Sequence, residues 1–156
     1  VTEMNNSISD NNESNMFVTL IVGILDLETG ILKLCNAGHN PPILIYPDGQ
    51  VSYLEFKTQI FVGVVEDFKY SDEEVVLEKE SKLFLYTDGV TEAENINKEL
   101  YGEEKLLEML SDNASSDVRT TVNVVVDSIA SHVKEAEASD DLTILLIQYE
   151  PGTANS

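Results

Sequence analysis

Three aspartates lie where strands predicted from the sequence end or begin. Asp88 follows an apolar run in the stretch LFLYTDGVTE (83–92), and Asp140 and Asp141 directly precede the apolar run at 142–149. Short apolar runs bounded by turn residues are typical of buried strands. If these two strands are antiparallel neighbours, the end of one lies beside the start of the other, and the carboxylates converge at one rim. Converging carboxylates repel unless a proton or a cation lies between them, and Mg²⁺ and Mn²⁺ prefer such oxygen ligands.

The same spacing has a simpler interpretation. Asp88 would then only stabilise a turn before Gly89, and Asp140 and Asp141 would be solvated side chains. On spacing alone this alternative is the more frequent outcome, so a metal site needs further support from the sequence.

The other polar candidates carry weaker signals. His39, in AGHNPP, could act as a general acid, but a histidine in a Pro-Pro turn more often bonds backbone groups. His132 lies near the negative end of a predicted helix, which favours a structural role. Cys35 lies among apolar strand residues and is predicted to be a small core residue. The sequence contains no P-loop, no GxGxxG and no Cys/His metal spacing.

The charge of the chain excludes several classes of partner. Its 156 residues include 29 acidic and 9 basic ones, which gives a formal net charge of −20. Nucleic acid and anionic lipid are bound mainly through Lys and Arg, so neither is an expected partner. The single cysteine rules out an internal disulfide, and neither a signal peptide nor an apolar run long enough to span a bilayer is visible. We therefore expect a cytoplasmic protein without direct membrane contact.

The elements that would position the aspartates are antiparallel strands first and helices afterwards. Apolar runs separated by turn residues predict strands over 16–26, 31–37, 43–46, 51–54, 74–78, 81–86 and 142–149. The first of them looks like a central strand, and a hairpin is expected across Lys79 and Glu80. Amphipathic helices are predicted over 102–110 and from an N-cap at Asp117 to about Val133. The residues expected to face the core include Val18, Leu20, Val22, Ile24, Leu34, Leu83, Leu85, Ile144 and Leu146. This order of elements predicts an α+β fold.

Five short stretches, taken together, indicate a family. They are MFVT (16–19), NAGHNPP (36–42), YTDGVTEA (86–93), YG (101–102) and DDLT (140–143). Each is weak alone, but in this order and at these spacings they closely resemble the SpoIIE/RsbU-like branch of the PPM metal-dependent serine/threonine phosphatases. The resemblance implies a sandwich of antiparallel β-sheets flanked by helices, with a two-metal Mg²⁺ or Mn²⁺ site at one end.

The resemblance also implies which residues form the site. Asp88 of the TDG motif matches one metal ligand of the family, Asp140 matches another, and Asp141 is the fallback for Asp140. No catalytic side chain beyond these metal ligands is implied. The residues that the resemblance places in the vicinity of the active site, without a chemical step of their own, are Gly38, His39, Asn40 and Gly89.

One motif of the family has no counterpart in the sequence. The family begins with a strand pair and a GDxxD-type motif whose aspartate bridges both metals, and nothing in residues 1–15 matches it. Residues 1–8 instead resemble the end of the helix that precedes MFVT. We therefore predict a partial phosphatase domain over 1–150 and a tail over 151–156, with weak or absent metal binding in this fragment. Uncovered sheet edges predict self-association, most simply as a symmetric homodimer.

The leading functional hypothesis is a phosphatase that acts on phosphoserine or phosphothreonine in bacterial partner switching. The resemblance implies that its substrate is a phosphorylated anti-sigma-factor antagonist (STAS) protein and that a sensor domain precedes it in the parent chain. The alternative is a catalytically inactive binding module for a STAS-type partner. The retained Asp88 and Asp140 argue against this alternative, because a pure binder has no need of them. A haloacid-dehalogenase-type phosphatase is excluded, since no DxD motif follows an early strand.

Overall fold

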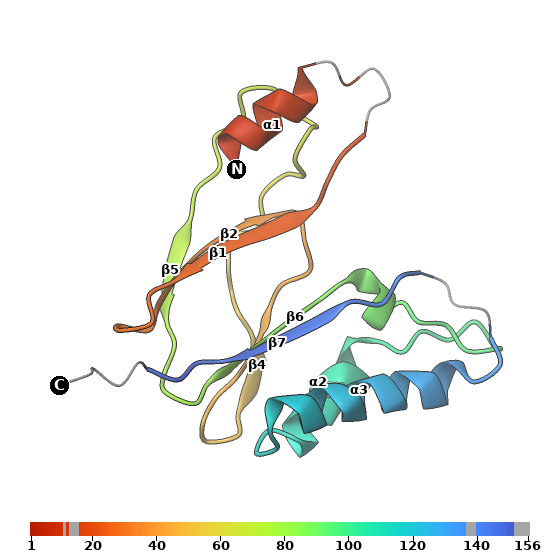
Figure 1. Cartoon of the computed structure of the whole chain (residues 1–156). Coiled ribbons are helices and arrows are strands. Elements are labelled where there is room, and N and C mark those ends of the chain that lie inside the picture. The colour runs from red at the N-terminus through yellow and green to blue at the C-terminus, as the bar shows by residue number, and fades with distance from the viewer. Residues whose placement is uncertain (11, 13–15, 137–139, 152–156) are drawn as a thin grey trace. The chain divides into compact units, whose positions relative to one another are not determined.

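The computed structural model describes residues 1–10, 12, 16–136 and 140–151, which form two compact units (Figure 1). The first unit combines Val1–Pro41 with Glu55–Leu77, and the second combines Pro42–Leu54 with Glu78–Glu150. Each unit contains one antiparallel sheet. The predicted tail at 151–156 lies outside the described residues except for Pro151.

The first unit is built on a three-stranded sheet in the order β1-β2-β5. β1 (Leu20–Leu25) and β2 (Ile31–Ala37) form a hairpin, and β5 (Glu73–Val76) pairs with the opposite edge of β2. A short helix, α1 (Thr2–Ser9), precedes the sheet. This helix confirms the prediction that residues 1–8 are helical.

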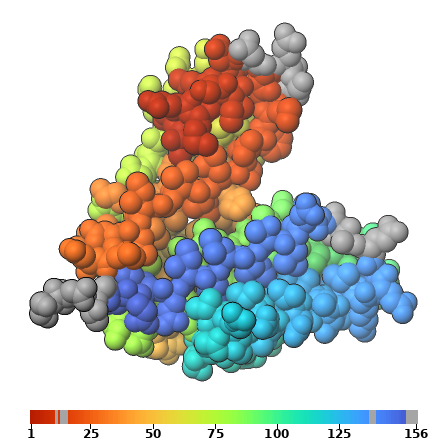
Figure 2. All heavy atoms as spheres, in the orientation of Figure 1, coloured from red at the N-terminus to blue at the C-terminus, as the bar shows by residue number. Residues whose placement is uncertain are grey.

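The strand predicted over 16–26 is shorter than expected and is an edge strand. Among the described strands, β1 begins at Leu20 and pairs with β2 alone, whereas Val18 forms an isolated bridge with Val62. Val18, Val22 and Ile24 were expected to face the core but are 44%, 41% and 70% exposed. Figure 2 shows the atoms of the β1–β2 hairpin (orange) at the surface of the first unit. An apolar run predicts a strand but does not reveal whether one neighbour or two will cover it.

The second unit is built on a four-stranded sheet in the order β4-β3-β6-β7. Its strands are β3 (Ile43–Ile45), β4 (Val51–Tyr53), β6 (Lys82–Tyr86) and β7 (Ile144–Gln148). On one face of this sheet Phe84 and Leu146 join a buried cluster with residues of two helices. Leu34, Leu83 and Leu146 are buried as predicted.

The two helices of the second unit confirm the helical predictions closely. They are α2 (Glu103–Asp112) and α3 (Val118–Val133), which pack against each other, α2 also against β4 and α3 against β7. Asp117 is the N-cap of α3, since its carboxylate accepts a hydrogen bond from the N–H of Thr120 (3.0 Å). Antiparallel sheets with helices on one of them confirm the α+β class.

The hairpin predicted across Lys79 and Glu80 is wrong, because β5 and β6 belong to different sheets. The N–H of Leu77 donates to the carbonyl oxygen of Gly30 (2.8 Å), which continues the pairing of β5 within the first unit. The N–H of Glu80 instead donates to the carbonyl oxygen of Tyr149 (2.8 Å) in the second unit. The turn residues were recognised, but the partner of each strand depends on contacts distant in the sequence.

Cys35 is a core residue, as predicted, with 8% of its surface exposed. The side-chain amide of Gln59 donates to its sulfur (3.6 Å). Burial raises the pKa of the Cys35 thiol, and the hydrogen bond from Gln59 only partly opposes this effect. In the part of the chain that the structure describes, no helix is both long and apolar enough to cross a bilayer.

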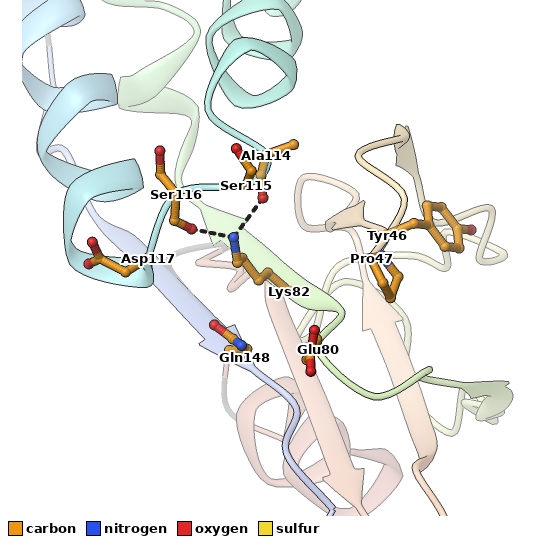
Figure 3. Close-up of a pocket in the computed structure, with 9 residues that line it drawn as sticks. All are labelled: Tyr46, Pro47, Glu80, Lys82, Ala114, Ser115, Ser116, Asp117 and Gln148. Atoms are coloured by element: carbon orange, nitrogen blue, oxygen red, sulfur yellow. Dashed lines mark hydrogen bonds between the residues drawn. The ribbon is translucent and has the colours of Figure 1, made fainter.

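Lys82 joins the sheet of the second unit to the connection between α2 and α3. Although it is a lysine, it is only 6% exposed. Its ammonium donates hydrogen bonds to the main-chain carbonyl oxygens of Ala114 (2.7 Å) and Ser116, beside a cavity of about 410 Å³ (Figure 3). Burial lowers the pKa of Lys82, and the negative charge of Asp117 opposes that shift. The side chain therefore holds the helical connection on β6.

We expect Lys82→Met to lower the free energy of unfolding by about 1–3 kcal/mol, because two partly buried carbonyl groups lose their donor while the side-chain volume is nearly kept. Urea denaturation measures the change. Lys79→Met is the matched control, since the Lys79 side chain is 63% exposed and forms a surface ion pair with Glu80. It should change stability by less than about 0.5 kcal/mol. Equal effects of the two substitutions would contradict the anchoring role.

Candidate metal centre

The pairing of β6 with β7 places the candidate aspartates at one end of the second sheet. The two strands are antiparallel with Tyr86 opposite Ile144, so the chain leaves β6 beside the point where it enters β7. The pairing continues beyond the strands, since the N–H of Thr87 donates to the carbonyl oxygen of Thr143 (3.1 Å). The sequence-based expectation that the two strands are antiparallel neighbours is therefore confirmed.

The hydroxyl of Thr87 ties the two chain segments together. It donates to the carbonyl oxygen of Asp141 (3.1 Å) and accepts from the N–H of Thr143 (3.1 Å). These bonds fix the backbone on either side of Leu142 against the end of β6. Sequence reasoning did not single out Thr87, although its place in the TDG motif was a usable signal.

Asp88 begins a short 3₁₀ turn, Asp88–Val90, which follows β6 directly. One carboxylate oxygen accepts a hydrogen bond from the N–H of Gly89 (3.0 Å), and the main-chain carbonyl accepts from the N–H of Glu92 (2.8 Å). Gly89 and Val90 are buried, whereas Asp88 is exposed. The turn thus fixes the backbone and leaves the carboxylate at the surface, where an ion can reach it.

Gly89 lets its own backbone lie closer to the backbone of Asp141 than any residue with a Cβ atom would allow. A Cβ at this position would lie 2.5 Å from the carbonyl oxygen of Asp141 and 3.0 Å from its carbonyl carbon. Both atoms belong to the backbone, so they cannot move aside as a flexible side chain would. The glycine therefore sets the separation between the turn that carries Asp88 and the segment that carries Asp140 and Asp141.

Asp140 and Asp141 are both exposed, at the start of the segment that leads into β7. A carboxylate oxygen of Asp140 accepts from the N–H of Asp141 (2.7 Å). This bond orients Asp140. The main-chain carbonyl oxygen of Asp141 instead accepts the hydrogen bond from the Thr87 hydroxyl and lies close to Gly89. The structure thus brings Asp88, Gly89 and Asp141 together through the backbone, with Asp140 adjacent in the chain.

The donor set suits a hard divalent cation but supplies only part of its coordination shell. Exposed carboxylates are the oxygen ligands that Mg²⁺ and Mn²⁺ select, and these ions usually keep several waters. Within the described ranges, no three His, Cys, Asp or Glu side chains gather closely enough to hold an ion by themselves. The exposed carboxylates of Asp88 and Asp140 are of the kind that such an ion binds, and water or other groups would have to complete its shell.

Gly38, His39 and Asn40 lie in the first unit, in a loop held by a residue that sequence reasoning missed. Asn36 is 2% exposed; its side chain donates to the carbonyl oxygen of His39 (2.9 Å) and accepts from its N–H (2.8 Å). The Nδ1 atom of His39 lies 3.1 Å from the hydroxyl oxygen of Thr19. The histidine is therefore fixed through both its backbone and its ring.

The conformation of Gly38 explains why the loop carries a glycine. Its φ is +77°, and a Cβ there would lie 2.1 Å from Cδ1 of the Phe61 ring. His132, by contrast, lies in the second unit with its Nε2 atom 2.9 Å from the carbonyl oxygen of Glu99. This contact agrees with the structural role expected for His132.

The sequence is similar to those of curated proteins over most of its length. It is 27% identical over 139 residues to Protein IcfG of Synechocystis sp., which is 89% of this chain and 22% of IcfG. It is 24% identical over 146 residues to the phosphoserine phosphatase RsbU of Bacillus subtilis, which is 93% of this chain and 43% of RsbU. The chain therefore spans less than half the length of these curated relatives.

Solved structures share the fold. The RsbU and RsbW domains of Rv1364c from Mycobacterium tuberculosis match with a TM-score of 0.73 at 23% identity, over 95% of this chain and 40% of that chain. The phosphatase domain of SpoIIE from Bacillus subtilis, presoaked with Mn, has a TM-score of 0.65 at 16% identity, over 86% and 58% of the two chains. RsbX in complex with magnesium has a TM-score of 0.63 at 19% identity, over 94% and 61%.

The motifs, the two antiparallel sheets and the rim of aspartates all agree with these matches. The family model described as Stage II sporulation protein E (SpoIIE) covers residues 1–150. The chain therefore belongs to the SpoIIE family.

Proposed function

We propose that this chain is part of a metal-dependent phosphatase that hydrolyses phosphoserine or phosphothreonine in proteins. The observation that carries the proposal is the rim formed by β6 and β7, where Asp88 and the pair Asp140 and Asp141 meet a tightly held backbone. Membership of the SpoIIE family and the name of RsbU, a phosphoserine phosphatase, support the same reaction.

The cation that fits this proposal is Mg²⁺ or Mn²⁺, two per complete domain. Structural relatives described with magnesium and with manganese support this choice. Asp88 and Asp140 would hold the cation, with Asp141 as the fallback for Asp140. A bound divalent cation lowers the pKa of its water and offsets the charge of a phosphate group. Without such an offset, a chain of net charge −20 would repel a phosphorylated substrate.

The residues around the carboxylates have a positioning role in this proposal. Thr87 and Gly89 fix the separation of the two aspartate-bearing segments, so the carboxylates need little rearrangement when a cation binds. Gly38, His39 and Asn40 are proposed to lie in the vicinity of the active site, as the family resemblance implies. No proton-transfer step is assigned to His39.

A serine-phosphorylated STAS protein is the proposed substrate, and a sensor domain is the proposed upstream partner in the parent chain. The cytoplasm is the proposed location, which suits the single thiol of Cys35.

The homodimer stays a prediction that sedimentation velocity can check; the exposed residues Val22 and Ile24 on β1 would supply part of its interface. The inactive binding module is the alternative, and no observation on the aspartate rim favours it.

The proposed function is tested by phosphate release from a phosphoserine peptide, with and without Mn²⁺. A protein in which a GDxxD-type segment precedes this chain should release phosphate, and EDTA should abolish the release. The chain without that segment should release little, because two carboxylates bind Mg²⁺ or Mn²⁺ weakly. Hydrolysis that persists in EDTA would refute the metal-dependent reaction, and a full absence of hydrolysis in the extended protein would favour the binding module.

A further inference from the structure

The segment between the aspartate turn and α2 forms a projecting hairpin, residues 94–100, which we name the arm. Its ends meet, since Glu94 and Leu100 form an antiparallel bridge. At its base the N–H of Tyr101 donates to the carbonyl oxygen of Ala93 (2.9 Å). The arm therefore leaves and rejoins the second unit beside the turn that carries Asp88.

The arm is held in one conformation by its own side chains. The side-chain oxygen of Asn95 accepts from the N–H groups of Asn97 (2.8 Å) and Glu99 (3.1 Å), and its amide donates to the carboxylate of Glu99 (2.7 Å). Lys98 has a φ of +65° and forms an ion pair with Glu94 (2.7 Å). A segment with this many internal bonds loses little conformational entropy when a partner binds.

Contacts with α3 fix the arm to the body of the second unit. Nε2 of His132 lies 2.9 Å from the carbonyl oxygen of Glu99, and the hydroxyl of Tyr101 donates to the hydroxyl of Ser128 (3.0 Å). The rings of Tyr101 and His132 pack edge to face, with centroids 5.7 Å apart. The arm is thus a fixed part of the surface.

This fixed arm presents apolar side chains to solvent. Ile96 is 70% exposed and Leu100 is 54% exposed. Folding alone gives no reason to hold these side chains in the open, because burying them would be favourable. Two exposed apolar side chains on one rigid hairpin offer a partner protein apolar area at little cost in conformational entropy.

A hollow of about 490 Å³ adjoins the arm and has an acidic lining. The residues that line it include Leu100, Tyr101, Glu103, Glu104, Lys105 and Glu108. The lining includes three carboxylates and one ammonium, that of Lys105, which lies over the Tyr101 ring at 4.9 Å from its centroid. The charge of the hollow therefore favours a basic side chain of a partner. A second copy of this chain is a poor occupant of the acidic hollow, since it has 29 acidic residues and only 9 basic ones to offer.

We propose that the arm and the hollow are a docking surface for the phosphorylated substrate protein. A basic side chain of that protein would enter the hollow, and an apolar side chain beside it would pack on Ile96 and Leu100. The proposal rests on the proposed function for its choice of partner. Because the base of the arm continues into the turn of Asp88, docking here would bring the substrate close to the aspartate rim.

The test measures binding and does not require hydrolysis. The probe is a fluorescently labelled, serine-phosphorylated STAS-domain protein, and its anisotropy is titrated with the chain. Leu100→Ser and Glu104→Lys should each raise the Kd about tenfold, the loss typical of an interface anchor or of a reversed charge. Affinity of the unsubstituted chain should fall as ionic strength rises.

Matched controls are available in the β1–β2 turn of the first unit. Leu27→Ser removes an apolar side chain that is 61% exposed, and Glu28→Lys makes the same change in net charge as Glu104→Lys. Both controls should leave the Kd within about twofold of the original. Equal losses at the arm and at the turn, or no binding of the probe by the unsubstituted chain, would overturn the docking proposal. Selective losses at the arm, combined with no phosphate release by the protein extended by a GDxxD-type segment, would retain the docking surface and refute the phosphatase instead.

Discussion

Asp88→Asn is expected to lower the affinity for Mn²⁺ by more than about 100-fold and to abolish phosphatase activity. The asparagine amide carries no charge and offers one oxygen where the carboxylate offers two. Substitutions that only disturb the support of a metal ligand already cost about 10–100-fold in affinity, so loss of a ligand should cost more. Asp140→Asn should have a similar effect, because the structure places both residues at the same rim of the second sheet.

The measurement is made on a protein in which a GDxxD-type segment precedes this chain. Calorimetric titration with Mn²⁺ gives the affinity, and phosphate release from a phosphoserine peptide gives the activity. Asp127→Asn is the matched control. Asp127 is exposed on α3, and its replacement by Asn removes the same negative charge. A loss limited to Asp88 and Asp140 would attribute the effect to metal ligation. Retention of the rate after both substitutions would show that the proposed metal mechanism is wrong.

The sequence predicted the elements that depend on local patterns. α3 begins after an N-cap at Asp117 and ends at Val133, as expected, because a capping aspartate and an apolar helical face are both local signals. The rim of aspartates was predicted from the ends of two apolar runs; the antiparallel pairing of those runs is confirmed as β6 and β7, and the role of the aspartates as metal ligands stays a prediction. One local pattern and one pairing were enough to place the three aspartates at one end of the second sheet.

The sequence could not predict features that depend on distant contacts. β5 pairs with β2 and not with β6, which no turn signal between residues 77 and 81 could reveal. Asn36 was predicted as a strand residue and as the first residue of NAGHNPP, but neither pattern shows that its buried amide holds the backbone of His39. The role of Gly89 was equally hidden, because it depends on where the backbone of Asp141 lies in space.

Gly89→Ala is expected to disrupt the aspartate rim without removing any ligand. The added Cβ would lie 2.5 Å from the carbonyl oxygen of Asp141, so the backbone around Asp141 must move. That movement also disturbs the hydrogen bond that Asp141 accepts from the hydroxyl of Thr87. Overpacking against a fixed backbone typically costs about 1–3 kcal/mol of stability. We expect a loss of that size and a fall of about tenfold or more in affinity for Mn²⁺.

Gly23→Ala separates this effect from the general cost of replacing a glycine. Gly23 lies in β1, and a Cβ there would lie 3.4 Å from the nearest atom, a methyl carbon of Leu32, and 3.8 Å from the carbonyl oxygen of Lys33. Urea denaturation and titration with Mn²⁺, both on the protein extended by a GDxxD-type segment, should therefore show little change for Gly23→Ala. If Gly89→Ala reduces stability but leaves the affinity for Mn²⁺ unchanged, the separation of the two segments matters only for folding. If it lowers the affinity while Asp88 and Asp140 are both present, the close approach of Gly89 to Asp141 is itself what positions the metal ligands.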